Sequence, residues 1–342
     1  MEMDLKKETA DRIRLTLDEN GEFRVLFVSD FHAPSDRDWD ERLPRAIGAL
    51  LDHTKADLCV NLGDFISDGE MDSEDRFRRY VSAIAGPCET RGVPWCHVPG
   101  NHDHEEGLPT EVFAAHPHCI SLRGPDSLPG YGTYMVPVHG SPDSDEPAFV
   151  IWLFDSHRGT GQWAEEYGIT APYDFAAATW GFDAGGGVYH AQARWYWERD
   201  LAMERRYGHK IPGIMGMHIP LQEHSLIPRN PSLTFMTGEL EESAGVPAFN
   251  PGLFAAAYER GDISAIVSGH DHINSFAGKY MGIELSEDAS LGYDVYGTDR
   301  LRGGRLITLK ASDPMRPDSV HAYLKDCPGA GDFIFREGHD NA

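Results

Sequence analysis

Short apolar runs rich in β-branched residues recur along this chain, and several of them end in residues that can bind a cation. The runs cover residues 23–29, 57–62, 93–98, 149–154, 211–217 and 263–268. Runs of this length and composition are typical of buried strands. Helix-like stretches lie next to several of them, at residues 42–54, 73–84, 192–207 and 251–260. The alternation predicts a layered α/β domain.

We expect one domain over residues 21–340, preceded by an N-terminal extension over residues 1–20. Strand-like pieces at residues 305–309, 320–324 and 333–335 are predicted to extend a second sheet. Polar stretches dense in Gly or Pro, at about residues 122–147, 158–187 and 222–252, are predicted to be long loops, which are often functional. The middle loop carries aromatic residues that would either hold it down or face a substrate: Trp163, Tyr167, Tyr173, Trp180 and Phe182.

An aspartate follows each of the first two runs. Asp30 and His32 are two positions apart, which places both side chains on the same side of an extended chain. Gly63 lets the backbone turn, so that Asp64 reaches the edge of the sheet. Because a carboxylate has two oxygen atoms, Asp64 could bridge two cations about 3.5–4 Å apart. Each motif alone would also fit an ordinary strand end.

The third run is followed by Gly100-Asn101-His102-Asp103, which is the most specific single signal. Asn101 offers a neutral oxygen ligand, and so adds no negative charge to the site. His102 could stay outside the coordination shell and donate a proton, while Asp103 orients its ring and raises its pKa. The alternative is an Asn-His turn with solvated side chains.

Histidines follow the last two runs. His218 ends a strand-like run, and a single histidine at such a place is often structural. Gly269 is followed by His270 and His272, whose spacing repeats that of the first motif and indicates metal binding more strongly. Because open α/β sheets bind ligands at the carboxyl ends of their strands, the motifs together predict one pocket. Its metal ligands would be Asp30, His32, Asp64, Asn101, His218, His270 and His272.

These ordered motifs resemble the five-block signature of the calcineurin-like metallophosphoesterases, over residues 30–272. The sequence resembles more closely the intracellular branch of that family that is related to purple acid phosphatases. The segments that carry this resemblance are residues 218–223, 250–254 and 269–274. The resemblance implies a four-layer fold, in which two mixed β-sheets pack as a sandwich flanked by helices. It also implies two neighbouring metal sites that share Asp64. One would be completed by Asp30, His32 and His272, and the other by Asn101, His218 and His270.

The chain departs from the purple acid phosphatases at two positions. Those enzymes have Tyr three residues after the bridging Asp and Gly two residues after the first Asp, where this chain has Ser67 and His32. We therefore expect no tyrosinate-to-iron colour. Oxygen and nitrogen donors without a thiolate suit two divalent or mixed-valence ions of Mn, Fe, Zn or Co.

We expect hydrolysis of a phosphate ester, with a phosphomonoester favoured, by attack of a metal-bound hydroxide and protonation of the leaving oxygen by His102. Asn101 and His102 are candidate substrate contacts. His157 and Arg158, just beyond the run 149–154, are further candidates, although such a loop pair is often solvated. A small phosphorylated compound, a cyclic nucleotide or other small diester, and a phosphoprotein all stay open as substrates.

The composition of the chain indicates which partners and which compartment to expect. The chain has 30 basic and 55 acidic residues, and its net charge of −25 repels a nucleic-acid backbone. Its 5 cysteines show no CxxC spacing and fit a reducing compartment. With no apolar run long enough for a signal or a membrane span, we expect a cytoplasmic protein without membrane contact. The rival from another class is a catalytically weak scaffold that binds proteins, which the intact donor set disfavours.

Overall fold

The strands form two mixed sheets in the computed structural model, which describes residues 8–34, 40–67, 73–106, 111–158, 186–247, 249–328 and 330. The order in the seven-stranded sheet is β1 (Leu15–Thr16), β5 (Tyr134–His139), β6 (Pro147–Phe154), β7 (Gly213–Met217), β8 (Ile263–Ser268), β10 (Ile283–Glu287) and β9 (Ala277–Tyr280). The order in the five-stranded sheet is β12 (Asp318–Tyr323), β11 (Gly303–Lys310), β2 (Glu22–Val28), β3 (Leu58–Asn61) and β4 (Trp95–His97).

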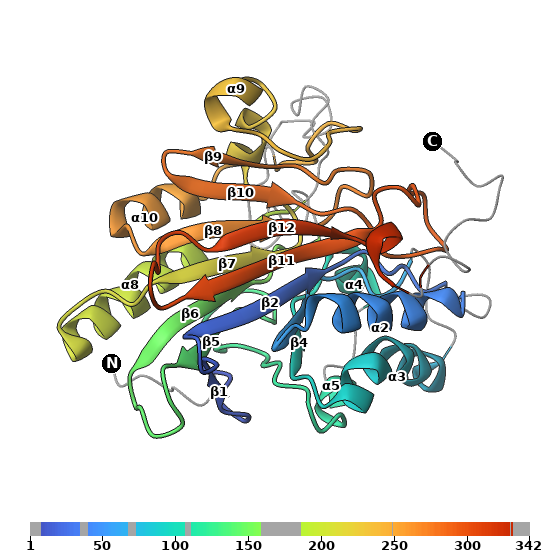
Figure 1. The fold of residues 1–342 in the computed structure, drawn as a ribbon, viewed down its shortest axis with the longest axis horizontal. Coiled ribbons are helices and arrows are strands. Elements are labelled where there is room, and N and C mark those ends of the chain that lie inside the picture. The colour runs from blue at the N-terminus through green and yellow to red at the C-terminus, as the bar shows by residue number, and fades with distance from the viewer. Residues whose placement is uncertain are drawn as a thin grey trace.

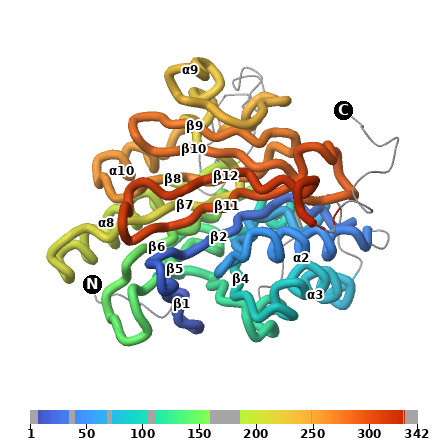
Figure 2. Tube along the Cα trace, viewed as in Figure 1, coloured from blue at the N-terminus to red at the C-terminus, as the bar shows by residue number. Residues whose placement is uncertain are grey.

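Side chains of β2 alternate between the two faces of its sheet, and this alternation builds the layers. Val25 and Phe27 belong to a buried cluster with residues of β5, β6, β7 and β8, so the two sheets pack face to face. Leu26 and Val28 point the other way and belong to a cluster with the helices that cover the five-stranded sheet. β2 lies between β3 and β11, which brings early and late parts of the chain side by side (Figure 2).

Helices cover the outer faces of both sheets (Figure 1). On the five-stranded sheet these are α2 (Arg42–Thr54) and α3 (Glu74–Arg91), and on the seven-stranded sheet α8 (His190–Tyr207) and α10 (Leu253–Arg260). The shorter helices are α4 (Asn101–Glu106), α5 (Glu111–Ala114), α9 (Pro231–Thr234), and the 3-10 turns η1 (Gln222–Leu226) and η2 (Leu324–Asp326). The expected architecture of two mixed sheets flanked by helices is confirmed. Among the described residues, none of the helices combines the length and the apolar character that a membrane span needs.

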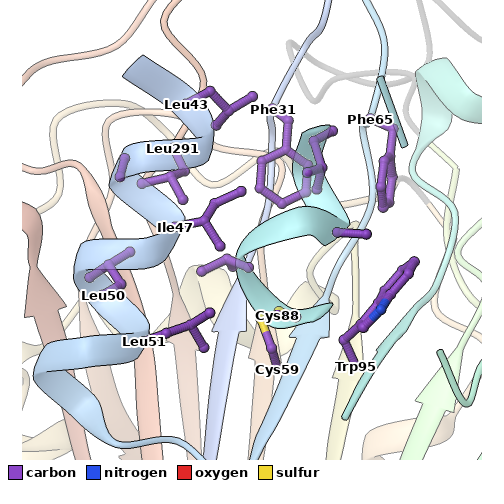
Figure 3. Close-up of a cluster of buried hydrophobic side chains, with 14 of the residues drawn as sticks. Phe31, Leu43, Ile47, Leu50, Leu51, Cys59, Phe65, Cys88, Trp95 and Leu291 are labelled. Atoms are coloured by element: carbon purple, nitrogen blue, oxygen red, sulfur yellow. The ribbon is translucent and has the colours of Figure 1, made fainter. Parts of the chain in front are cut away.

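The apolar stripe of α2 explains why this helix packs where it does. Leu43, Ile47, Leu50 and Leu51 recur at helical spacing and are buried. Figure 3 shows these side chains pointing into a cluster that includes Phe31, which stands between two of the expected metal ligands. The core under α2 therefore supports the turn that follows β2.

Helix α3 is longer than the predicted stretch, because it continues to Arg91. Gly86 and Pro87 are helix-breaking residues, and they made the predicted helix end too early. Pro87 and Cys88 are buried against the core, so packing offsets the backbone hydrogen bond that a proline inside a helix cannot donate. The helix ends where Gly92 adopts a φ of 65°.

Three stretches differ from the expected layout. Residues 134–139, inside a stretch expected to be a loop, form β5, whose side chains are all buried. The expected N-terminal extension includes β1, which pairs in parallel with β5. The last pieces, β11 and β12, extend the sheet that contains β2. Of the other calls, residues 333–335 and most of the loop 158–187, with its aromatic residues, lie outside the described residues.

Candidate metal centre

The turns that follow β2, β3 and β8 carry the expected ligands in a backbone conformation that is uncommon for residues other than glycine. The φ angles are 57° at Asp30, 48° at His32, 54° at Asp64 and 77° at His270. Such left-handed residues cost conformational energy, and they cluster at functional sites. Hydrogen bonds fix the first two turns to each other, because the backbone N–H groups of Phe31 and His32 both donate to the carbonyl of Asp64.

Two of the motif glycines are required by a close approach of the backbone. A Cβ atom on Gly63 would lie 2.2 Å from the backbone nitrogen of Gly100, and a Cβ on Gly100 would lie 2.1 Å from Asp64 Oδ1. Neither position has room for a side chain. The glycines before Asp64 and Asn101 therefore let the turns after β3 and β4 touch.

The side chains of the expected ligands converge from both sheets. β2, β3 and β4 run parallel in one sheet, and β7 and β8 run parallel in the other, so their carboxyl ends meet at one place. Three groups of donor atoms lie within 4.8 Å of one another there. The groups are Asp30 with His32 and His272, Asp30 with Asp64 and His218, and His32 with Asp64 and His102.

Asp64 stands at the middle of this cluster. Its Oδ2 atom lies 3.2 Å from His218 Nε2, 3.4 Å from His32 Nε2 and 3.9 Å from His102 Nε2. Its Oδ1 atom accepts the backbone N–H of His102 at 3.1 Å. One oxygen of Asp64 therefore faces the ring nitrogens of histidines that follow different strands. A bridging carboxylate needs this placement.

Asp30 has one oxygen that hydrogen bonds do not satisfy. Its Oδ2 accepts the hydroxyl of Ser29 at 2.5 Å and the backbone N–H of His270 at 3.1 Å. Its Oδ1 is buried and accepts no hydrogen bond from the described part of the chain, and it lies 3.5 Å from His272 Nε2. A buried oxygen without a hydrogen bond is costly unless a cation or a proton is nearby, so this geometry fits a metal ion.

Backbone carbonyls fix the protonation of two ring nitrogens. His218 Nδ1 donates to the carbonyl of Leu62 at 3.0 Å, and His272 Nδ1 donates to the carbonyl of Tyr296 at 3.0 Å. In the neutral ring each Nε2 then carries the lone pair that faces the cluster. Metal-binding histidines are oriented in this way.

The second site of the predicted pair is less compact. Asn101 Oδ1 lies 3.0 Å from His218 Nε2, so the amide and the ring approach the same point. The ring of His270 lies edge-on to His218, with 5.2 Å between the centroids. His270 belongs to none of the three donor groups, however, and its role stays a prediction.

The buried aspartates and histidines of the cluster shift each other's pKa values. Burial alone would raise the pKa of Asp30, but His218 and the two imidazoles of His272 and His32 lower it well below its usual value. Burial would lower the pKa of His218, but Asp64 and Asp30 raise it to about 9. Burial lowers the pKa of His32 despite its acidic neighbours. The carboxylates therefore stay ionised and ready to hold positive charge.

Asp103 does not contact His102 in the way that the sequence suggested. Its carboxylate instead accepts the backbone N–H groups of Asp64 at 2.8 Å, Phe65 at 2.9 Å and Gly100 at 2.9 Å. Burial and the charge of Asp64 raise its pKa to about 7. Asp103 thus fastens the turns after β3 and β4 together, and the orienting role expected for it needs correction.

His102 lies at the edge of the cluster. Its side chain is 22% exposed, whereas that of Asp64 is 1% exposed. Its ring lies edge-on to His32, with 5.1 Å between centroids. A ring in that position can reach both the cluster and a bound molecule.

His157 is not placed as a phosphate contact. Its side chain is buried, its ring stacks on Tyr189 with 3.8 Å between centroids, and its φ is 59°. The chain therefore covers the ring, which the sequence pattern could not indicate. Arg158 is exposed, and its contact with a substrate stays a prediction.

Tyr296 and Ser67 support the site, although the sequence indicated a supporting contact for neither of them. The ring of Tyr296 stacks on His272, with 4.1 Å between centroids, and its backbone carbonyl accepts the hydrogen bond from His272 Nδ1. Ser67 donates to the carbonyl of His32 at 2.9 Å, so the residue at the tyrosine position of purple acid phosphatases has a structural contact here. No local motif marks these residues, because each acts through a partner that is distant in the sequence or through its backbone.

The donor set consists of carboxylate, amide and imidazole groups. The cysteines are buried elsewhere and belong to none of the donor groups among the described residues. Such donors suit Mn, Fe, Zn or Co rather than a metal that requires thiolates. The residues present therefore fit a site for transition-metal ions.

Comparisons with known proteins show what this chain is similar to. A family model described as calcineurin-like phosphoesterase matches residues 23–274. "Probable inactive purple acid phosphatase 14" of Arabidopsis thaliana is 28% identical over 323 residues, which cover 84% of this chain and 74% of the relative. "Phosphatase DCR2" of Saccharomyces cerevisiae is 24% identical over 292 residues, which cover 77% of this chain and 46% of the relative. Among solved structures, a dimetal phosphatase from Danio rerio gives a TM-score of 0.49 at 14% identity, covering 84% of this chain and 92% of that chain.

Proposed function

This chain belongs to the calcineurin-like phosphoesterase family, and from that premise we propose that it is a phosphoric ester hydrolase that uses two metal ions. The observation that supports this most is the position of Asp64 Oδ2, which faces the ring nitrogens of His32, His102 and His218. Carboxylate and imidazole donors from both sheets surround that oxygen. A pair of cations sharing one carboxylate is the arrangement of two-metal hydrolases.

The residues that would hold the ions divide into two sets around Asp64. Asp30, His32 and His272 would hold one ion, and Asn101, His218 and His270 the other. When bound, two ions of Mn, Fe, Zn or Co would supply the Lewis acidity that polarises a phosphate and acidifies water. Within this chain, Leu62 and Tyr296 keep ring nitrogens of the site directed at the cluster through their carbonyls.

His102 is the group that we assign to proton transfer. Its ring lies at the exposed edge of the cluster, and the turn beneath it is fixed by its backbone N–H, which donates to Asp64 Oδ1. A histidine beside a bound ester can donate the proton that the leaving oxygen needs. His102 would therefore act as the general acid.

Relatives whose names contain "probable inactive" raise the question of whether this chain has activity. In this chain each position of the expected ligand set carries an oxygen or nitrogen donor, and the donors of Asp30, His32, Asp64, His218 and His272 approach one another. A scaffold without catalysis would not need that convergence. We favour a phosphomonoester as substrate, and a small diester is the alternative.

One experiment tests the proposal. Protein purified with each candidate metal would be analysed for its metal content and assayed with p-nitrophenyl phosphate and bis-p-nitrophenyl phosphate. We expect two metal ions per chain, and faster release of p-nitrophenol from the monoester than from the diester. Faster release from the diester would reverse the substrate assignment, and a fully metal-loaded protein inert toward both esters would refute hydrolysis.

A further inference from the structure

A buried histidine–aspartate pair lies beside the candidate metal centre but outside its donor groups. His104 Nε2 lies 2.7 Å from Asp155 Oδ1, and the exposed fractions of the two side chains are 5% and 0%. His104 belongs to α4, the helix that begins with Asn101 and His102. Asp155 follows β6 in the opposite sheet. The pair therefore connects the turn after β4 to the strand end of the other sheet.

Asp155 is held rigidly enough to serve as an anchor. The backbone N–H of His157 donates to its Oδ1 at 2.8 Å, and that of Tyr131 donates to its Oδ2 at 2.7 Å. The side chain of Gln192, on α8, donates to its backbone carbonyl at 2.7 Å. Both carboxylate oxygens and the carbonyl are thus hydrogen-bonded, Oδ2 and the carbonyl to segments distant in the sequence, and the side chain has little freedom to follow α4.

Aromatic rings enclose His104. Tyr131 lies against it with 4.7 Å between centroids, and His157 stacks on it at 5.7 Å. The hydroxyl of Tyr131 also donates to the backbone carbonyl of Asp103 at 3.3 Å. These contacts hold α4 along one side.

The helix geometry places the two histidines of α4 on different sides. Residues advance by roughly 100° each around a helix, so His102 and His104 point about 200° apart. His102 faces Asp64, and His104 faces Asp155. Since α4 spans only Asn101–Glu106, a contact on its far side fixes the orientation of the near side.

We propose that the His104–Asp155 pair positions His102 for proton transfer, an inference that rests on the proposed phosphoesterase function. His104 is a positioning residue, because its ring is buried and directed away from the cluster. His157 and Tyr131 pack against His104 and so help to hold the pair. The buried His157 thereby has a function other than phosphate binding.

The test compares three substitutions. His104→Leu keeps the bulk but removes the hydrogen bond to Asp155, and His104→Gln keeps an amide donor near the Nε2 position. His118→Gln is the matched control, because it breaks a 2.8 Å contact between His118 Nδ1 and Glu89 at the opposite end of β4. Each protein is assayed with p-nitrophenyl phosphate, which has a good leaving group, and with β-glycerophosphate, which has a poor one. Thermal unfolding and metal content are measured for each.

For His104→Leu we expect kcat with β-glycerophosphate to fall about 10–100-fold, while kcat with p-nitrophenyl phosphate changes little, since only a poor leaving group needs the proton. His104→Gln restores most of the loss, and His118→Gln leaves both rates unchanged. When His104→Leu is added to His102→Ala, it lowers kcat no further, because both residues act on the same step.

A second readout does not depend on activity. In histidine-labelled, zinc-loaded protein, the ring signals of His102, assigned by their loss in His102→Gln, should shift or broaden in His104→Leu and return in His104→Gln. An unchanged His102 signal, or an equal loss of rate with both esters, would overturn the positioning role. If the wild-type protein hydrolyses neither ester, the proposed function fails, and the ring signals alone still decide whether the pair positions His102.

Discussion

The Nε2 atoms of His32 and His272 lie 3.1 Å apart, although the residues are separated by 240 positions and follow strands of different sheets. His272 donates through its other ring nitrogen to Tyr296, so in its neutral form Nε2 presents a lone pair to His32. Asp30 Oδ1, which is buried and accepts no hydrogen bond from the described residues, lies 3.5 Å from the same nitrogen. These donors would gain most from a shared cation, which links the packing of the two sheets to metal binding.

Removal of the proposed general acid should affect substrates unequally. We predict that His102→Ala lowers kcat for β-glycerophosphate by about 10²–10⁴-fold, because a poor leaving group needs protonation. The rate with p-nitrophenyl phosphate should fall much less. Steady-state kinetics with both esters measures this, and a turnover of β-glycerophosphate equal to that of the wild type would exclude the acid role.

Metal affinity should rise with pH. The pKa of His218 in the metal-free protein is raised to about 9 by Asp64 and Asp30, against the effect of burial, so below pH 9 the ring holds a proton that a metal must displace. We predict that affinity increases about tenfold per pH unit between pH 7 and 8.5 for the release of one proton. Calorimetric titration in buffers of different ionisation enthalpy counts the proton, and a pH-independent affinity would contradict the assignment.

Asp103 should matter although it belongs to none of the donor groups. In Asp103→Asn, an amide N–H₂ group would face backbone N–H groups that now donate to the carboxylate, at a cost of about 1–3 kcal/mol in the free energy of unfolding. Metal affinity should fall as well, because the turns after β3 and β4 loosen. The control is Asp57→Asn, which alters a carboxylate that accepts a backbone N–H at the other end of β2 and β3. Urea unfolding and metal titration of both variants check this, and equal metal affinities would count against it.

His97 should make the protein sensitive to acid. Burial lowers the pKa of His97 to about 3, from the usual 6.5, and its ring stacks on Phe113 with 3.6 Å between centroids. Between pH 6.5 and 3 the unfolded chain binds a proton that the folded protein excludes, so this contribution to stability is complete above pH 6.5 and is lost as the pH falls. Below pH 6.5 the free energy of unfolding should fall less steeply with falling pH in His97→Gln than in the wild type. We predict a difference in slope of up to about 1.4 kcal/mol per pH unit. Urea unfolding between pH 4 and 7 measures both slopes, which would be parallel if His97 had no part.

The sequence contains enough information to predict several strands and the candidate ligands that follow them. Glycine before Asp64 and glycine before Asn101 indicate close turns, and the structure places those turns in contact. The apolar runs predict β2, β3 and β8 because buried strands need continuous apolar side chains on both faces.

Other features depend on partners that no local pattern reveals. β5 was hidden inside a stretch rich in Gly and Pro, and it is a strand because it pairs with β6 and β1. Asp103 was expected to act on its sequence neighbour, but its carboxylate binds backbone groups that only the packed turns bring near. The contact between His104, on α4, and Asp155, after β6, joins residues 51 positions apart.

The most direct measurement is anomalous X-ray diffraction from crystals of the protein loaded with manganese. We predict two peaks about 3.5–4 Å apart, one on each side of Asp64, with Asp30, His32 and His272 around one and Asn101, His218 and His270 around the other. No peak beside Asp64 in a protein shown to be metal-loaded, or peaks that lie only elsewhere, would contradict the two-metal centre.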